Sequence, residues 1–429
     1  MRAMVGRDWL ASGKHAPLNP VKLDGMLRRA ALAALVAASL WACSRPIPHN
    51  DAPPPRGQSY ADYLASGQAK PPTRPADTND TDEMVVHVIN VGQGNAILLE
   101  FPCGAVLVDT GGEKNAHWDG VAHLTAYLDK FFARRTDLDK TFELLLLTHP
   151  HLDHTRGVEA ILSRYTVHNV VDDGMHNEWL VQDGKKVPDE GGLNQIALET
   201  WARKHADTVG YDAVRVDDIG PRGLTDGVID PVNGCKRSIT DPQIRALWGQ
   251  EFEDRDTFGN NPNNHSVALR VDFGKSSVFL PGDLEFIGES RLAKKFAAER
   301  SIFDVDVYIA GHHGSKNGTS KYLMEEMTPD LAVISAGPYG RTATWSARRF
   351  GHPHRDAIAH MTSREYGVKW NRPDPIDAMV GVRGAWKDEI VEKFEKRHIS
   401  KAVYCTCWDG DVQVHMNANG WIHVDHEGK

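Results

Sequence analysis

Three histidines and one aspartate fall within six residues of this chain, in the sequence THPHLDH over residues 148–154. The apolar run just before this sequence predicts a buried strand, and the cluster lies where that strand opens into a loop. The i, i+2 spacing lets His149 and His151 face one metal ion. Asp153 and His154, past a turn, can face a second ion, because imidazole and carboxylate groups are ligands of zinc, iron and manganese. The alternative, a solvated histidine-rich loop, does not explain so many ligand side chains in so short a stretch.

The beginning of the chain has the pattern of a bacterial secretory signal. Residues 26–29 form a short basic stretch, and residues 30–42 form an apolar segment that is too short to span a bilayer. The segment ends in Leu-Trp-Ala-Cys, which resembles a lipobox, so Cys43 is the candidate site of lipidation. We therefore expect a signal peptide over residues 1–43, with Met26 as an alternative start, and a lipoprotein anchored at the periplasmic side of a membrane. A single-pass membrane anchor is the alternative.

Composition separates a tether from a folded domain and narrows the range of partners. Residues 44–83 are rich in Pro, Asp, Ser and Thr, which predicts a disordered tether before a folded domain over residues 84–429. Residues 1–42 hold six Lys or Arg and two Asp or Glu, so their removal changes the formal net charge from −9 to −13. A surface with this charge repels polyanions at long range, which disfavours a general nucleic-acid binder with a broad basic face.

Predicted strands and helices alternate along the folded domain, which indicates an α/β fold with polar residues at the strand ends. Two segments, residues 173–262 and 337–385, have weak periodicity and are interpreted as insertions. Long segments between regular elements usually form lids or pockets, so we expect them to determine specificity.

Four cysteines remain after residue 43, at positions 103, 235, 405 and 407. In an oxidising compartment an even number permits two disulfides, and four cysteines allow three pairings. The sequence Cys405-Thr406-Cys407 lacks the spacing of a zinc finger. The cysteines therefore predict a structural disulfide as one alternative and no metal ligation.

Further motifs occur in a fixed order around the histidine cluster. They are NVGQGNA at 90–96, LVDTG at 107–111, NNHS at 263–266, PGD at 281–283, GHHGS at 311–315 and GHP at 351–353. With these motifs the chain resembles the metallo-β-lactamase superfamily, in the branch of the C-terminal hydrolase domain of the competence protein ComEC, and more distantly phosphorylcholine esterase. The resemblance covers nearly all of residues 84–416 and implies an αββα sandwich with metals at one edge between two sheets. Asn90 and Asn95 depart from it, because members usually have Asp there, so identity with the activity of the competence nuclease is not implied.

The resemblance also implies roles for residues outside the cluster. Asp283 would bridge the two metal ions, and one of His312 and His313 would complete the second ion, although the sequence does not separate these two. His265 is either a third histidine for the first ion or a polar strand residue with structural partners. Asp109 is expected to orient a ligand histidine without binding metal itself.

Asp153 and His352 are the candidate catalytic residues. His352 would donate a proton to a leaving group or hydrogen-bond a phosphate oxygen, and the alternative is an ordinary histidine at a helix N-terminus. Arg341, Arg348 and Arg349 are candidate substrate contacts, because arginine can bind phosphate through two hydrogen bonds. The same arginines would also fit a solvated face.

These observations predict a hydrolase with two divalent metal ions, Zn²⁺ or alternatively Mn²⁺ or Fe. A metal-bridging hydroxide would attack a small phosphodiester or a nucleic acid, which makes the protein a phosphodiesterase or nuclease. The chain has no Gly-x-Ser-x-Gly motif, so a serine nucleophile is not expected. The alternatives are hydrolysis of an amide, lactone or thioester, and a non-catalytic lipoprotein scaffold that binds DNA or an envelope partner. No protein partner can be inferred.

Overall fold

The computed structural model describes residues 82–182, 184–233, 237–251, 261–341, 343, 346–382 and 394–427. The expected signal peptide, Cys43 and nearly all of the expected tether lie outside these residues. The described residues all belong to one compact unit, residues 56–429. Within the described part of the chain, we find no helix with the length and apolar character needed to cross a membrane.

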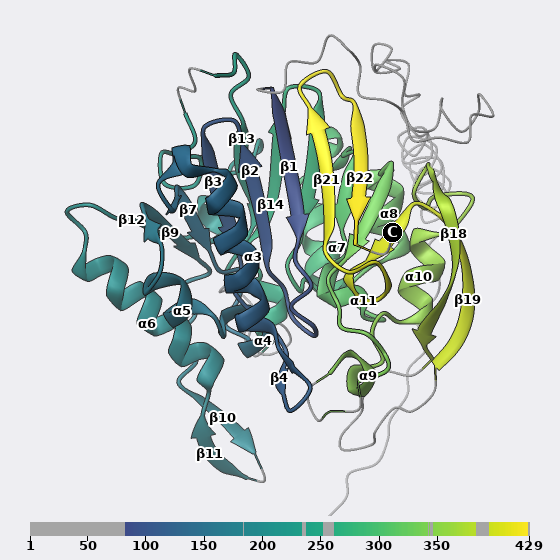
Figure 1. Ribbon diagram of the computed structural model, residues 1–429, viewed down its shortest axis with the longest axis horizontal. Coiled ribbons are helices and arrows are strands. Elements are labelled where there is room, and N and C mark those ends of the chain that lie inside the picture. Colours follow the sequence, from purple (N-terminus) through teal and green to yellow (C-terminus); the bar gives the residue numbers. More distant parts are fainter. Residues whose placement is uncertain are drawn as a thin grey trace, which may run out of the picture. The chain divides into compact units, whose positions relative to one another are not determined.

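Eight strands form the first sheet, in the order β12-β9-β7-β3-β2-β1-β21-β22 (Figure 1). Their bounds are β1 Glu83–Val88, β2 Ile97–Phe101, β3 Gly104–Val108, β7 Leu144–Leu146, β9 Asn169–Asp172, β12 Gly210–Ala213, β21 Val412–Asn417 and β22 Ile422–His426. The strands β3, β7, β9 and β12 run parallel to one another. Their C-terminal ends therefore meet at one edge of the sheet. β1 begins at Glu83, one residue before the predicted start of the folded domain at residue 84.

Six strands form the second sheet, in the order β13-β14-β15-β16-β17-β20. Their bounds are β13 Gln243–Trp248, β14 Ala268–Phe273, β15 Ser276–Leu280, β16 Val307–Ile309, β17 Leu331–Ile334 and β20 Val403–Cys405. The last four strands of this order are parallel. The second sheet therefore also gathers several strand ends at one edge.

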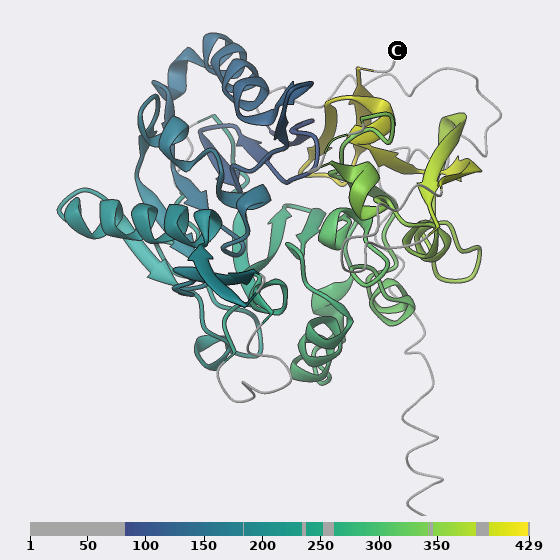
Figure 2. The same cartoon turned by 90° about the horizontal axis from the view of Figure 1, so that it is seen from below.

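The alternation of side chains along the strands explains how the layers pack. Val86 and Val88 of β1 point into a buried apolar cluster that they share with the second sheet. Leu98 and Leu107, on the opposite face of the first sheet, belong to a separate apolar cluster with the helices that cover it. Helices α3 (Gly120–Arg134) and α6 (Glu190–Lys204) cover the first sheet, and α7 (Phe286–Lys295), α8 (Lys321–Met327) and α10 (Arg355–Met361) cover the second (Figures 1 and 2). The predicted αββα sandwich is confirmed.

Helix α3 shows how local sequence sets an element of this sandwich. Its N-cap Asp119 accepts a hydrogen bond from the backbone N–H of Ala122 at 3.0 Å, and a cap of this kind is worth about 1 kcal/mol. Leu124, Leu128 and Phe131 follow at helical spacing and are buried against the first sheet. The observed helix matches the amphipathic pattern of its sequence.

The two predicted insertions contain more regular structure than the sequence indicated. Residues 173–262 hold the hairpin β10 (Trp179–Gln182) and β11 (Lys185–Pro188), as well as α6, β12 and β13. Strands β12 and β13 are edge strands that pair through backbone hydrogen bonds, so they need little apolar alternation and give a weak signal in the sequence. Residues 337–385 hold α9 (Ala347–Phe350), α10 and β18 (Asn371–Gly381), which pairs with β19 (Phe394–Lys401).

Disulfides occur at two places in the described chain. Cys405 and Cys407 are bonded to each other across Thr406. Cys103 is also disulfide-bonded, whereas Cys235 lies outside the described residues. The described cysteines therefore form disulfides, which was one of the alternatives predicted from the sequence.

Candidate metal centre

The candidate ligands lie in loops that follow strands of both sheets. His149 follows β7 of the first sheet, whereas Asp283 and His313 follow β15 and β16 of the second. The parallel pairs β3–β7 and β15–β16 bring these strand ends to the same edge, where ligands of α/β proteins usually bind. Asp153 and His154 lie in the short helix α4 (Leu152–Thr155), directly after His151.

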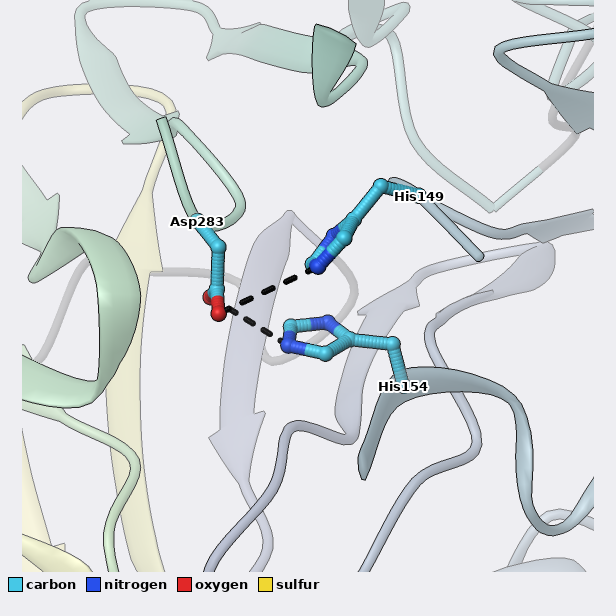
Figure 3. A group of neighbouring side chains, drawn as sticks. All are labelled: His149, His154 and Asp283. Atoms are coloured by element: carbon cyan, nitrogen blue, oxygen red, sulfur yellow. Dashed lines mark ion pairs between the residues drawn. The ribbon is translucent and has the colours of Figure 1, made fainter. Parts of the chain in front are cut away.

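Two overlapping groups of side chains have ligand atoms that lie within 4.8 Å of one another. One consists of His149, His154 and Asp283 (Figure 3), and the other consists of Asp153, His154 and His313. The Asp283 carboxylate faces both groups, since Oδ1 is 3.2 Å from Nε2 of His154 and Oδ2 is 3.3 Å from Nε2 of His313. Oδ2 is also 3.9 Å from Nε2 of His149. This is the position that the resemblance implied for a bridging ligand.

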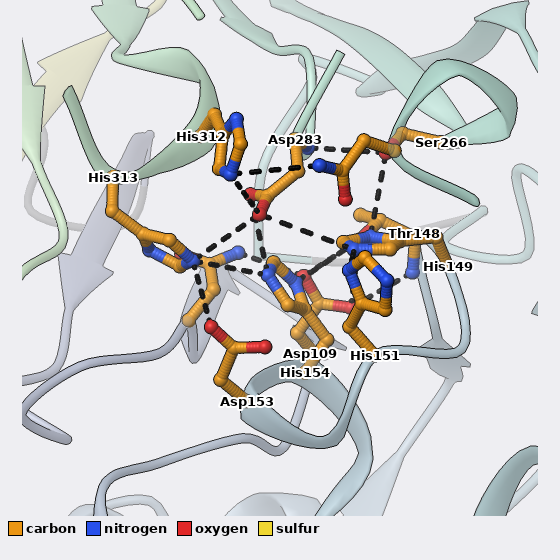
Figure 4. Close-up of polar contacts among 12 residues, drawn as sticks. Asp109, Thr148, His149, His151, Asp153, His154, Ser266, Asp283, His312 and His313 are labelled. Carbon is orange, nitrogen blue, oxygen red and sulfur yellow. Dashed lines mark hydrogen bonds and ion pairs between the residues drawn. The ribbon is translucent and has the colours of Figure 1, made fainter. Parts of the chain in front are cut away.

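His151 lies beside His149, as its i, i+2 spacing predicts. Nδ1 of His151 is 3.0 Å from Nε2 of His149 (Figure 4). The two imidazoles therefore present nitrogen atoms to the same point, next to the Asp283 carboxylate. The structure brings all four side chains of the opening cluster to the site.

Asp109 holds His154 in the orientation that a ligand needs. Its Oδ2 lies 2.7 Å from Nδ1 of His154, so the hydrogen-bond network assigns the Nδ1 proton to this contact and leaves Nε2 facing the site. Asp109 itself accepts hydrogen bonds from the backbone of Thr148 and from Nδ2 of Asn95, both at 2.8 Å. Asn95 is one of the two departures from the family pattern, and here its amide donates to a carboxylate where an ionised Asp could not.

The contact between Asp109 and His154 depends on a close approach of two backbone segments. A Cβ at Gly111 would lie 1.5 Å from the carbonyl oxygen of Asp153, so only glycine lets the loop after β3 pack against α4. Asp109, two residues earlier, has a φ of +60°, a conformation that costs most residues energy. Surrounding hydrogen bonds hold Asp109 in this conformation beneath His154.

The structure distinguishes the two adjacent histidines that the sequence left equivalent. Nδ1 of His313 donates to the carbonyl oxygen of Ser335 at 2.9 Å, and its Nε2 lies 3.3 Å from Oδ2 of Asp153. His313 therefore belongs to the second ligand group. His312 lies farther away, with Nε2 3.7 Å from Oδ2 of Asp283 and 3.5 Å from Nδ2 of Asn263.

Of the two alternatives for His265, the geometry favours a residue with structural partners, at the end of the short 3-10 helix Pro262–His265. His265 belongs to neither ligand group, and its Nδ1 accepts a hydrogen bond from the backbone N–H of Glu251 at 3.1 Å. The next residue, Ser266, faces the site instead: its Oγ accepts from the N–H of Asp283 at 3.0 Å and lies 3.3 Å from Nδ1 of His149. Sequence reasoning missed Ser266, although it stands in the same NNHS motif.

His352 lies against the centre without joining either ligand group. Its ring stacks on that of His313 at a centroid distance of 6.0 Å and meets the ring of His312 edge-on at 5.7 Å. Burial and then the charges of His312 and His313 keep the pKa of His352 well below its ordinary value. A neutral imidazole fits the expected hydrogen-bonding role better than the role of proton donor.

The three predicted substrate arginines do not reach the cavity beside the centre. The Arg341 guanidinium lies over the ring of Trp118 at 4.0 Å, and its Nη1 is 3.6 Å from Oε2 of Glu113. Arg348 and Arg349 are half-buried on α9, and neither is among the cavity-lining residues that the structure describes. The prediction rested on local charge density, which does not show where a guanidinium finds its partner.

A cavity of about 540 Å³ opens beside the metal ligands. His151, Asp153 and Asp283 line it on the ligand side, together with His312 and His352. Its lining also includes residues of α9 and of the hairpin β10–β11, so the predicted insertions do contribute to the pocket.

Burial and neighbouring charges set the protonation states of the candidate ligands. Burial lowers the pKa values of His154 and His313, but neighbouring carboxylates raise them more, so these two rings would release a proton when an ion binds. The other candidate ligands are already in the form that an ion needs. Burial lowers the pKa of His149 well below its ordinary value, and the neighbouring His154 and His151 lower it further. Burial alone would raise the pKa of Asp283, but the charges of His154 and His313 hold it well below its usual range. Neutral imidazole and ionised carboxylate are the ligand forms that zinc, manganese and iron require. The residues present therefore fit the two-ion site.

Comparison with known proteins gives the following similarities. The model of the metallo-beta-lactamase superfamily matches residues 89–337. Recombination protein 2 of Haemophilus influenzae is 28% identical over 267 residues, which are 62% of this chain and 25% of that protein. ComE operon protein 3 of Bacillus subtilis is 26% identical over 287 residues, 65% of this chain and 30% of that protein. The chain thus spans a quarter to a third of the length of these relatives. The solved metallo-beta-lactamase fold protein YhfI from Bacillus subtilis is 14% identical, covers 59% of this chain and 86% of its own, and has a TM-score of 0.32.

Proposed function

The chain belongs to the metallo-β-lactamase superfamily of metal-dependent hydrolases, and from that premise we propose that it hydrolyses phosphodiesters as a phosphodiesterase or nuclease. One observation carries the proposal: the Asp283 carboxylate faces both ligand groups, so that two ions would sit side by side. Paired divalent ions of this kind are common in enzymes that cleave phosphate esters.

The ligand assignment that we propose combines the two geometric groups with the order of the histidine motif. His149, His151 and Asp283 would hold the first ion, and Asp153, His154, His313 and Asp283 the second. When bound, two Zn²⁺, Mn²⁺ or Fe ions would supply a water of lowered pKa and would stabilise negative charge on the phosphate oxygens. Asp109 and the carbonyl group of Ser335 fix the rings of His154 and His313, so that their Nε2 atoms are presented without rearrangement.

Other side chains of the cavity are available to the substrate. Within the described chain, Oε1 of Gln93, Oδ1 of Asn263 and Nδ1 of His352 are buried and make no hydrogen bond. All three residues line the cavity. Buried polar atoms are nearly always hydrogen-bonded. The two amide oxygens would accept a hydrogen bond from the attacking water, and Nδ1 of His352, when it carries the ring proton, would donate to a substrate oxygen.

The relatives support a phosphodiester more than a carbon-centred ester. The name of one relative, Recombination protein 2, refers to recombination, which is a process of DNA. From these relatives we infer for this chain only the activity of a hydrolase domain. We further propose that the domain lies at the cell envelope and is anchored through a lipid on Cys43. A Cys43→Ala variant should then move from the membrane fraction to the soluble fraction, and an unchanged distribution would contradict the lipid anchor.

The decisive experiment is hydrolysis of bis-p-nitrophenyl phosphate by the purified chain, with and without added Zn²⁺ or Mn²⁺. We expect turnover that depends on metal and is lost in Asp283→Ala and His151→Ala. Cleavage of a lactone, thioester or amide panel with no phosphodiester turnover would replace the proposal with the carbon-centred alternative. Tight binding of single-stranded DNA, measured against salt and without any cleavage, would favour the scaffold.

A further inference from the structure

The hairpin β10–β11 forms one wall of the cavity beside the metal ligands. It precedes α6 directly and projects from the end of that helix that begins at Glu190 (Figure 1). Leu180 pairs with Val187 across the two strands, and Trp179 pairs with Pro188. On β10, Leu180 lines the cavity whereas Trp179 does not, and on β11 both Val187 and Pro188 line it. Within β10, Trp179 is therefore a neighbouring apolar position outside the described lining.

The cavity wall away from the metal ligands is apolar. The hairpin contributes Leu180, Val187 and Pro188, α4 contributes Leu152, and α9 contributes Phe350. Leu180 keeps 41% of its surface exposed, although it stands beside a candidate catalytic centre. Apolar side chains that line a concave site favour ligands that cover them.

The charges of the same lining disfavour a chain of phosphates. Among the described residues of the lining there is no lysine or arginine, and the charged residues beyond the metal ligands are Asp189 and Glu190. Asp189 is the N-cap of α6, where its Oδ1 accepts from the N–H of Gly191 at 3.2 Å, whereas Glu190 is exposed. A second phosphate next to the reacting one would face these carboxylates, and no lysine or arginine of the described lining would contact it.

We propose that the cavity selects a phosphodiester that carries a single phosphate and an apolar aryl or alkyl substituent, which packs on the wall formed by Leu180 and Val187. This inference rests on the proposed function and names its substrate class. Hydrolysis would form a bond from the water oxygen to phosphorus and break the bond from phosphorus to one ester oxygen. That oxygen would leave with a proton from water as an alcohol or phenol. A polynucleotide would be the poorer substrate.

The test uses alkylphosphonates, from methylphosphonate to hexylphosphonate, as competitive inhibitors of bis-p-nitrophenyl phosphate hydrolysis by the full chain with Zn²⁺. Each inhibitor has one anionic group and one apolar arm, so only the length of the arm changes. We expect the inhibition constant to fall on the order of tenfold from methyl to hexyl. Leu180→Ser should abolish most of this gradient, and the matched control Trp179→Ser, on the same strand but outside the cavity lining, should keep it.

A second arm compares a short single-stranded oligonucleotide with hexylphosphonate. The oligonucleotide should inhibit more weakly, and Glu190→Lys should strengthen its inhibition several-fold. Any of three results would overturn the inference. They are an inhibition constant that does not depend on the length of the alkyl arm, an equal effect of Trp179→Ser and Leu180→Ser, and stronger inhibition by the oligonucleotide. If the wild-type chain hydrolyses no phosphodiester, the proposed function fails instead, and calorimetric titration of the Zn²⁺-loaded chain with the same phosphonates still tests the wall.

Discussion

Two of the buried histidine–carboxylate clusters in the described part of the chain differ in how their charges are balanced. At the metal centre, Nε2 of His154 faces Asp283 and Nε2 of His313, and its Nδ1 is held by Asp109. On the outer face of the first sheet, His87 has partners on both nitrogens: Tyr127 at 2.7 Å and Glu100 at 3.0 Å.

The second cluster is complete without a ligand. Arg134 binds Glu100 through two hydrogen bonds of 2.8 and 2.6 Å, and Arg135 adds another of 2.8 Å. This cluster lines a cavity of about 690 Å³, which is larger than the cavity at the metal centre. Cavity size therefore does not locate the reactive site. The informative difference lies in the cationic partners. At the metal centre, several ligand nitrogen and carboxylate oxygen atoms face one another without an arginine or lysine among the described lining residues, whereas Arg134 and Arg135 neutralise Glu100 in the second cluster.

The largest expected effect breaks the metal centre and spares the other cluster. Asp283→Ala should lower metal-dependent phosphodiester turnover by about a thousandfold, because bound ions contribute several kcal/mol to the stabilisation of charge in the reaction. Metal content measured on the same sample should fall below two ions per chain. Full activity with two ions bound would show that Asp283 is not a bridging ligand.

A substitution in the second cluster should lower the free energy of unfolding and leave the rate of hydrolysis nearly unchanged. Glu100→Gln leaves Arg134 and Arg135 without their buried carboxylate, so the free energy of unfolding should fall by roughly 3 kcal/mol in urea titrations. The activity of the folded variant should remain within about twofold of wild type. A loss of turnover in a stably folded Glu100→Gln protein would mean that the two clusters are coupled.

A smaller effect is expected when the orientation of a ligand is disturbed. Asp109→Asn should weaken metal binding by roughly 10- to 100-fold, because His154 loses the carboxylate that fixes its ring. Competition with a chelator of known affinity measures this change. Thr125→Ser, on α3 away from the site, provides a control that should bind metal like wild type.

The most gradual effect, when counted per pH unit, is the dependence of metal binding on pH. Burial lowers the pKa of His313, but Asp283 and Asp153 raise it more, to about 10. His313 therefore holds a proton at neutral pH in the metal-free protein, and an ion must displace it. Affinity should rise by up to about tenfold per pH unit below pH 10 for each displaced proton. Equal dissociation constants at pH 6 and pH 8 would contradict this account.

The histidine cluster could be predicted from its own local spacing. The αββα sandwich was predicted from the resemblance of the ordered motifs to the superfamily, and the bridging role of Asp283 has the same basis and stays a prediction. The role of His265 could not be predicted, because the direction in which a residue leaves a short turn depends on tertiary contacts, here with Glu251. The partners of Arg341 were hidden for the same reason, since Trp118 and Glu113 are more than two hundred residues away.

The ligands of the centre come from loops of both sheets, His149 and His154 from the first and Asp283 and His313 from the second. An ion bound there would cross-link the two sheets of the sandwich. Any ligand that binds only the folded state adds to its stability, by about 4 kcal/mol at a thousand times the dissociation constant. The supply of metal would thus control the lifetime of the folded protein as well as its activity, and a chelator should lower its melting temperature even where no substrate is present.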